Sequence, residues 1–280
     1  MRKFSRILNL RYLGLLGALL SLSACSSMDV MDRLLASSSN HQTSAEQPVA
    51  NSDNSDNSAS SSSTTSGRDE LAQVQNLAPS SKTYPSSGAI SGPQDFQSVK
   101  VGDWAVYKIL KDGQLSQVVK LAVVAKTDEA WVYEFDNYTN DQSSALQMAV
   151  KNLNQALSTS SEPEKILWMK VKDKNGKITK IEGAYLGMMG GMSKAALTGG
   201  APDVSSTVEK GGSITVPAGT FQGTLKVTSQ VTSGKASHSG TAWVSTLVPL
   251  WHVVKSVSDD GSTSMELVDF GTKGFVSAFE

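Results

Sequence analysis

The sequence predicts a mainly β (α+β) fold: a large, curved, antiparallel, half-barrel-like sheet with one or two helices, preceded by a signal peptide and a disordered linker. Segments that alternate apolar and polar residues recur from about residue 95 onward, and short turn signals separate them. Aromatic residues, which strands favour, gather in the same region. It holds all five tryptophans, Trp104, Trp131, Trp168, Trp243 and Trp251. We therefore divide the chain into residues 1–24, 25–94 and 95–280.

Residues 1–24 have the order of an export signal. A basic segment, Met1–Arg11, precedes the apolar run Tyr12–Leu22, which is too short for a membrane-spanning helix. The run ends in Leu22-Ser23-Ala24-Cys25, which resembles the lipobox of bacterial lipoproteins. The resemblance implies a diacylglycerol on the Cys25 thiol, cleavage before Cys25 and acylation of the new amine. Several acyl chains on one residue anchor a protein stably, whereas a single chain does so only marginally.

The alternative is an ordinary signal peptide followed by an incidental buried cysteine. Ser26 and Ser27 follow Cys25, and no aspartate stands beside it. By analogy with enterobacterial sorting, this favours the outer membrane, at its periplasmic face or at the cell surface. The expected partner is therefore a membrane, reached through the N-terminal lipid anchor.

The composition excludes several classes of protein. Without residues 1–24 the chain has 21 basic and 26 acidic residues, a net charge of −5, which does not favour nucleic acid as a partner. A single cysteine excludes an internal disulfide framework and a cysteine-based zinc site. The chain has no P-loop, no G-x-S-x-G and no H-E-x-x-H motif, and we expect neither a cofactor nor a metal.

Residues 25–94 are expected to form a flexible linker between the anchor and the β domain. The tract Ser37–Ser66 consists largely of Ser, Asn, Asp and Thr, which cannot bury enough apolar area to offset chain entropy. Asp69–Leu77 has Leu71, Val74 and Leu77 at spacings of three. We interpret it as a transient helix within the linker, and a docking peptide for a partner is the alternative.

The first part of the β domain reads as a meander followed by a helix. Asp103–Lys111, Leu115–Ala125 and Trp131–Tyr138 are expected strands, and Asp112-Gly113 is a hairpin signal. In Ser143–Leu157, apolar residues recur at the helical period, so a helix is expected there. The Asn175-Gly176 turn joins two further expected strands, Glu164–Lys172 and Lys177–Glu182.

Five more strands complete the expected sheet. They lie near Ser213–Val216, Thr220–Val231, Ala236–Ser245, His252–Val257 and Thr263–Phe270. The short connections between them predict mainly antiparallel pairing.

A resemblance adds to this pattern over about Ser213–Gly271. The segments that carry it are Pro217–Phe221, Trp243–Ser245, Val248–Leu250, Val254–Ser256 and Met265–Gly271. They resemble the C-terminal half of a class of uncharacterised bacterial lipoproteins and periplasmic domains. That class is thought to share the curved-sheet fold of the lipoprotein carriers LolA and LolB. The resemblance implies a half-barrel with an apolar inner surface, and it carries no ligand residues over.

We expect the β domain to act without catalysis, binding a hydrophobic ligand, such as a lipid or lipoprotein acyl chain, or an envelope protein. A structural or assembly factor with a filled core is the alternative, and a periplasmic hydrolase is the third. Six aromatic residues are predicted to line the concave surface: Trp104, Tyr107, Trp131, Tyr133, Trp168 and Trp243. Ordinary core packing explains them equally well. Met188, Met189 and Met192, among glycines, are predicted to form a lid, with a loosely packed connection as the alternative.

Residues for hydrolytic chemistry are few. A Ser–His–carboxylate site needs His238 or His252, because the third histidine lies in the linker. A glycosidase needs two juxtaposed carboxylates, and the sequence cannot pair its candidates. These candidates are Glu134, Asp136, Glu266 and Asp269. Lysines surround the Asn175-Gly176 hairpin and are interpreted as a solvated face, with anionic lipid as the alternative partner. They are Lys165, Lys170, Lys172, Lys174, Lys177 and Lys180.

The lipid anchor gives the first testable prediction. Cys25→Ser removes the thiol that the lipobox presents for acylation, so the exported protein should leave the membrane pellet and enter the soluble envelope fraction. Ser27→Ala is the matched control and should remain in the pellet. Fractionation followed by immunoblotting measures both variants, and a Cys25→Ser protein that still pellets would refute the anchor.

Overall fold

The fold is described from a computed structural model, over residues 67–86, 99–151, 165–183, 186, 203–233 and 236–280. One helix, α3 (Gly67–Gln75), precedes the strands in this part of the chain. The strands are β1 (Thr83–Tyr84), β2 (Trp104–Lys111), β3 (Gln114–Lys126), β4 (Trp131–Tyr138), β5 (Ser143–Lys151), β6 (Lys165–Lys172), β7 (Ile178–Glu182), β8 (Asp203–Val216), β9 (Gly219–Ser233), β10 (Ala236–Val244), β11 (Val253–Ser258) and β12 (Thr263–Gly271).

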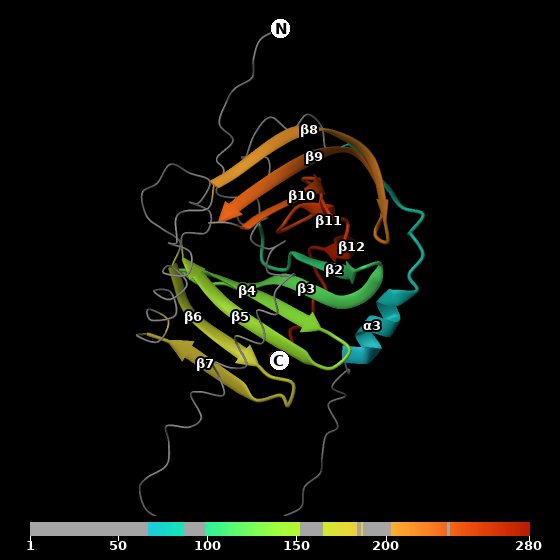
Figure 1. The fold of residues 1–280 in the computed structure, drawn as a ribbon. Helices are drawn as coiled ribbons and strands as arrows, with labels where there is room; N and C mark the ends of the chain where they lie inside the picture. The colour runs from blue at the N-terminus through green and yellow to red at the C-terminus, as the bar shows by residue number, and fades with distance from the viewer. Residues whose placement is uncertain (1–66, 87–98, 152–164, 184–185, 187–202, 234–235) are drawn as a thin grey trace, which may run out of the picture.

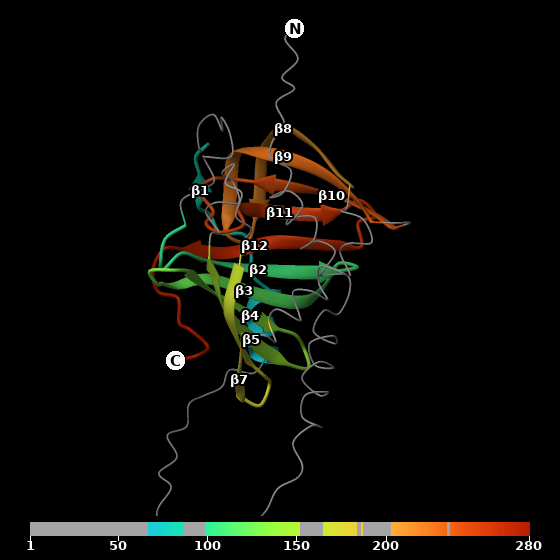
Figure 2. The same ribbon diagram turned by 90° about the vertical axis from the view of Figure 1, so that its left-hand side faces the viewer.

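These twelve strands form one open, curved sheet, which confirms the predicted fold class (Figure 1). Its order is β1-β9-β10-β11-β12-β2-β3-β4-β5-β6-β7, and β8 pairs with the other side of β9. Seen from the side, the strands follow one another from β8 and β9 at the top to β7 at the bottom (Figure 2). All pairings are antiparallel except the short one between β1 and β9.

The hairpin turns follow the sequence signals. Asp112 and Gly113 both have positive φ, 51° and 77°, which is the geometry of the two-residue turn that an Asp-Gly pair favours. Gly219 has φ 137°, and a Cβ there would lie 2.5 Å from the Lys82 carbonyl oxygen. Glycine at this position therefore lets β1 approach the start of β9, where the Thr220 N–H donates to that same oxygen.

The sheet has an inner, concave face and an outer face. The hairpin of β8 and β9 curls until the Ala218 N–H donates to the Leu267 carbonyl of β12. Val248 and Leu250, in the loop between β10 and β11, fill the concavity that this curl creates. The main core therefore lies on the inner face of β9–β12 and β2–β4, and Phe221 stacks on Tyr84 at a ring distance of 4.5 Å.

Helix α3 covers the outer face of the sheet at β3 and β4. Leu71 and Val74 of the helix are buried against Val118 of β3, and Glu70 forms a 2.8 Å ion pair with Lys120. Residues 67–86 thus pack on the sheet, whereas the sequence placed them in the linker of residues 25–94. The reason is tertiary: a nine-residue helix is marginal alone, but the apolar side chains of β3 stabilise it.

The prediction of a helix over Ser143–Leu157 is wrong for the residues that the structure describes. Ser143–Lys151 forms β5, which pairs with both β4 and β6, and residues 152–164 lie outside the described residues. The segment fits both the helical period and the strand period, because alanine is tolerated on the buried and on the exposed side of either element. Ala145 and Ala149 lie on the outer face, while Leu146 and Met148 face inward. Pairing on two sides supplies hydrogen bonds and burial that local helix propensity does not outweigh.

Packing of α3 is testable through its buried leucine. Leu71→Ala removes apolar contacts with β3 and should lower the free energy of unfolding by about 2 kcal/mol. Gln73→Ala, on the exposed side of the same helix, should change it by less than about 0.5 kcal/mol. Urea denaturation followed by tryptophan fluorescence measures both values, and equal stabilities of the two variants would show that α3 does not pack in solution.

Candidate functional site

Three of the predicted lining residues lie in the inner-face core. Tyr107 is fully buried, and its hydroxyl donates to the Val253 carbonyl at 3.1 Å. The Trp251 ring lies 5.5 Å from the Tyr107 ring and 6.4 Å from that of Phe135. Tyr133 and Trp131 belong to the same layer. Burial raises the pKa of the Tyr107 phenol, so this hydroxyl stays protonated and acts as a structural donor.

The other three predicted lining residues lie on the outer face. Trp104 alternates with inward-facing Ala105, and its indole N–H donates to the Lys273 carbonyl at 2.8 Å. Trp168 packs with Val132 and Ala149, and Trp243 lies opposite Lys255, outside the core. The structure therefore does not bring the six residues together, because successive side chains of a strand point to opposite faces. Contact of the inner three with a ligand stays a prediction.

A separate apolar layer covers the inner face at the far end of the sheet. We call this layer the β5–β7 apolar row; it consists of Leu146, Met148, Met169, Val171, Ile181 and Leu186. Cross-strand register aligns it, since Met148 lies opposite Met169, and Met169 lies opposite Ile181. The predicted lid residues Met188, Met189 and Met192 lie outside the described residues, as does Cys25.

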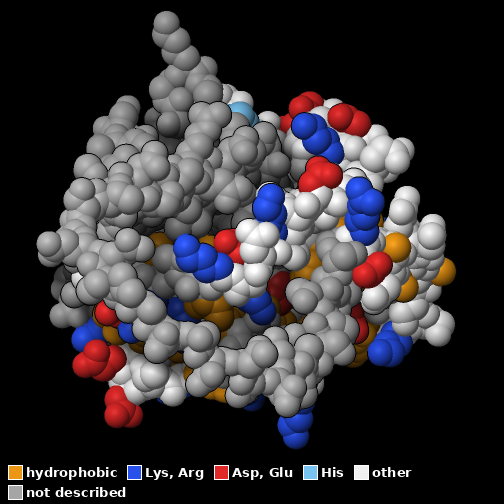
Figure 3. Space-filling view, turned by 90° about the horizontal axis from the view of Figure 1, so that it is seen from below, with side chains coloured by type: hydrophobic (Ala, Val, Ile, Leu, Met, Phe, Trp, Pro, Cys, Tyr) orange, Lys and Arg blue, Asp and Glu red, His pale blue; other side chains and the backbone are white. Residues whose placement is uncertain are grey.

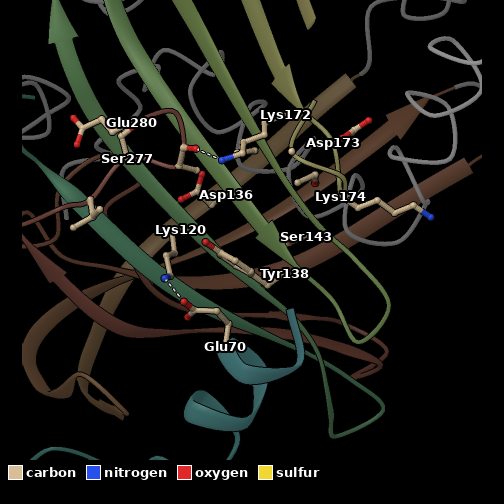
Figure 4. A pocket seen from close by; sticks show the side chains of 15 residues that line it. Glu70, Lys120, Asp136, Tyr138, Ser143, Lys172, Asp173, Lys174, Ser277 and Glu280 are labelled. Carbon is tan, nitrogen blue, oxygen red and sulfur yellow. Dashed lines mark hydrogen bonds and ion pairs between the residues drawn. The ribbon is translucent and has the colours of Figure 1, made fainter. Parts of the chain in front are cut away.

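The outer face carries a polar pocket between β3 and β6. Four residues in cross-strand register form its floor. In order across the sheet they are Lys120 of β3, Asp136 of β4, Ala145 of β5 and Lys172 of β6. The alanine leaves a hollow between the aspartate and the second lysine. The pocket has a volume of about 400 Å³, and its polar walls are visible in Figure 4.

Three separate segments wall this pocket. Glu70 reaches it from α3, Asp173 and Lys174 belong to the turn between β6 and β7, and residues 276–280 close the remaining side. The last segment is held in place because the Lys172 ammonium donates to the Ala278 carbonyl at 2.6 Å. Segments far apart in the sequence thus meet at one point on the outer face (Figure 4).

Glu134, beside the pocket, is a buried carboxylate with several partners. It accepts hydrogen bonds from Gln147 Nε2 at 2.7 Å, Ser277 Oγ at 2.7 Å and the Ala278 N–H at 2.6 Å. Its exposed fraction is 0%. These donors compensate the loss of water around the carboxylate and fix residues 277–278 on the sheet.

Asp136 is the unusual group of the pocket. Its exposed fraction is 2%, and its Oδ1 atom has no hydrogen-bond partner among the described residues. Burial, together with the charge of neighbouring Glu134 and a hydrogen bond to it, raises the pKa of Asp136 to about 8, although the Lys120 ammonium opposes the shift. Asp136 is therefore largely protonated at neutral pH.

Of the four carboxylates considered for glycosidic chemistry, the structure brings together only Glu134 and Asp136, two residues apart on β4. Glu266 lies between Lys255 at 2.8 Å and Lys108 at 3.1 Å. Burial raises the pKa of Glu266, but these two ammonium groups outweigh it and the net shift is downward. Asp269 is exposed and accepts the N–H of Phe270.

The two histidines lie apart. His238 is exposed on β10, whereas His252 is buried at the start of β11 with its Nδ1 atom 2.5 Å from the Val248 carbonyl. Along β10, His238 lies six residues before Val244, which pairs with the start of β11. That separation amounts to about 20 Å, too far for the two histidines to share one site.

Three lysines of the β6–β7 hairpin, Lys170, Lys172 and Lys180, contact other groups of the sheet or of the C-terminal segment. Lys180 pairs with Glu182 at 2.6 Å, and Lys170 lies 5.3 Å from the centre of the Trp168 ring. Lys174 and Lys177 are exposed, and the side chain of Lys165 is not among those described. Charges of both signs surround hydrophobic side chains on the lower face of the molecule, shown in Figure 3.

Two further findings concern the described residues only. Among them, no three His, Cys, Asp or Glu side chains are placed to hold a metal ion. No helix in the same part of the chain is both long and apolar enough to cross a membrane.

The chain matches no protein-family model and no curated protein sequence. Similar solved structures include a candidate lipoprotein from Parabacteroides distasonis, with 13% identity and a TM-score of 0.33, covering 63% of this chain and 98% of that one. A candidate exported protein with a YmcC-like fold from Bacteroides fragilis has 11% identity and a TM-score of 0.29, with the same coverage. MucB has 10% identity and a TM-score of 0.29, covering 69% of this chain and 62% of its own. Likenesses this weak establish neither a family nor a function.

Sequence reasoning missed the outer pocket. Its residues lie on six separate segments, and no local motif joins them. The one available signal was the Glu134-x-Asp136 spacing, which places two carboxylates on one face of a strand. Their burial was not predictable, because it depends on α3 and on residues 276–280.

The protonation of Asp136 predicts how stability depends on pH. An aspartate with a raised pKa holds its proton in the folded state but loses it in the unfolded state from about pH 4 upward. Stability should therefore fall as pH rises from about 4 to about 8, by at most about 1.4 kcal/mol for each pH unit.

Asp136→Asn should flatten this dependence. Relative to the wild type, the variant should therefore be more stable at pH 8 than it is at pH 5. The exposed Asp259→Asn is the control and should retain the wild-type slope. Urea denaturation at a series of pH values measures the slopes, and an unchanged slope in Asp136→Asn would show that Asp136 titrates normally.

Proposed function

We propose that this chain is a lipid-anchored outer-membrane protein whose β domain binds a hydrophobic ligand, such as the acyl chain of a lipid or of another lipoprotein. The anchor is Cys25, and the binding surface is the β5–β7 apolar row. The protein acts by binding, without catalysis. The alternative partner is a second envelope protein that presents an apolar segment.

The observation that carries this proposal is the division of the inner face. Over β9–β12 and β2–β4, the protein fills its own concavity with Val248 and Leu250. The β5–β7 apolar row is a second cluster that adjoins this core through Met148. It includes Met148 and Met169, and methionine adapts its shape to irregular apolar ligands.

A second function is favoured by the filled half of the sheet. If the apolar row is covered by the protein's own chain, the domain is a structural or assembly factor without a ligand. If the β5–β7 apolar row is packed at the density of a protein interior, no acyl chain can bind there. If it is an open binding surface, an acyl chain can. Binding of a fluorescent fatty acid separates these two functions.

The third function, hydrolysis, has weaker support. The described residues hold His252 against a backbone carbonyl and leave His238 exposed on another part of the sheet. Neither arrangement supports a nucleophile–histidine pair.

Binding is testable with cis-parinaric acid, a fluorescent fatty acid. Ile181 lies in the apolar row with an exposed fraction of 7%, and Ile181→Gln places a polar amide there, which should weaken binding at least about fivefold. Ile178→Gln is the matched control on the outer face of the same strand, where Ile178 is 49% exposed, and it should bind like the wild type.

Circular dichroism of both variants checks that the fold is retained. No fluorescence gain with the wild-type protein would overturn the hydrophobic-ligand function and favour the structural one. Equal binding by the two variants would place the ligand away from the β5–β7 apolar row.

A further inference from the structure

The outer pocket has the chemistry of a binding site that the proposed function does not use. It lies on the opposite face of the sheet from the β5–β7 apolar row, since Asp136 and Phe135 are neighbours on β4 that point to opposite faces. A volume of about 400 Å³ lies within the range of small-molecule sites. The pocket can therefore be occupied independently of the inner face.

The hollow exists because one small residue stands in a row of long ones. Ala145 lies between Asp136 on β4 and Lys172 on β6, and its side chain is too short to fill the space beside them. Ser143 continues the floor on the same strand, and Tyr138 and Ser277 stand at the walls. The floor and walls thus offer hydroxyl groups beside the apolar Ala145, Val276 and Ala278.

The charges around the pocket balance. Lys120, Lys172 and Lys174 stand against Glu70, Asp173 and Glu280. A cation entering the pocket meets ammonium groups on both sides of Asp136, and an anion meets carboxylates on the opposing walls. This arrangement favours a polar ligand that carries no net charge.

Asp136 supplies the deepest recognition group. Its Oδ1 atom is buried without a partner among the described residues, and a buried polar atom of this kind is stabilised by a hydrogen bond. Groups that face it are Glu134 and Tyr138 on its own strand, Lys120 on β3 and Glu70 on α3, with Lys172 beyond Ala145. The proton of Asp136 lies in its hydrogen bond with Glu134, so the Oδ1 atom is left to accept the O–H of a ligand hydroxyl.

We propose that this pocket binds an uncharged saccharide, with a sugar hydroxyl on Asp136, neighbouring hydroxyls on the Lys120 and Lys172 ammonium groups, and the ring over Ala145. The adjoining segment of residues 276–280 forms one wall of the site. The protein thus has two separate binding faces, an inner apolar one and an outer polar one.

Ligand-observed saturation-transfer NMR on the purified protein tests this proposal. The probes are cellobiose, maltose, galactose and N-acetylglucosamine, with glucosamine and glucuronate as charged counterparts. At least one neutral sugar should bind, with a dissociation constant on the order of 1 mM, and more tightly than both charged sugars. No transfer to any neutral sugar, or tighter binding of a charged one, would overturn the proposal.

Variants locate the sugar. Ala145→Leu fills the hollow and should reduce binding at least about tenfold, and Lys172→Gln should weaken it about fivefold. Lys180→Gln is the matched control, because Lys180 is an outer-face lysine of the neighbouring strand that does not line the pocket. Equal binding by Lys172→Gln and Lys180→Gln would exclude this pocket, even if Ala145→Leu fails to fold. Fatty-acid binding is measured on the same samples, so a failure here is separable from a failure of the proposed function.

Discussion

Burial of β4 on both of its faces is the constraint on which the rest of the structure depends. Tyr133 and Phe135 face the inner core, while Glu134 and Asp136, the residues that alternate with them, are buried on the outer face. Apolar side chains need only packing, but buried carboxylates need donors and neighbours of opposite charge. The outer face therefore requires Gln147, Ser277 and the Ala278 N–H around Glu134, and Lys120 beside Asp136.

The two faces of the sheet have different chemistry for this reason. On the inner face, the curl of β8 and β9 and the loop between β10 and β11 fill one half of the concavity. The β5–β7 apolar row lies beyond it and adjoins it through Met148. On the outer face, α3 and residues 276–280 stand apart on the sheet, and the space between them is the polar pocket. One domain thus presents apolar side chains on its inner face and a polar pocket on its outer face.

Where sequence reasoning succeeded, the signal was local. Trp131–Tyr138 was predicted as a strand with the bounds that β4 has, and the Asp112-Gly113 turn has the predicted geometry. It failed where two periods coexist, since the alanines of Ser143–Lys151 permit a helix and a strand equally, and pairing on both sides decides for the strand. It predicted the helix over Asp69–Leu77 but took it for a transient one within the linker, because the stability of α3 comes from contacts with β3.

The sequence by itself determined most of the strands and turns and the mainly antiparallel character of the sheet, and it predicts a lipobox at Leu22–Cys25. These follow from alternation, turn chemistry and adjacency, which are properties of neighbouring residues. Only the tertiary structure decided which aromatic residues share a face, that Glu134 and Asp136 are buried together, and that Ala145 leaves a hollow between Asp136 and Lys172. The physical reason is that burial and cross-strand register are set by segments distant in the chain, whose approach no local pattern records.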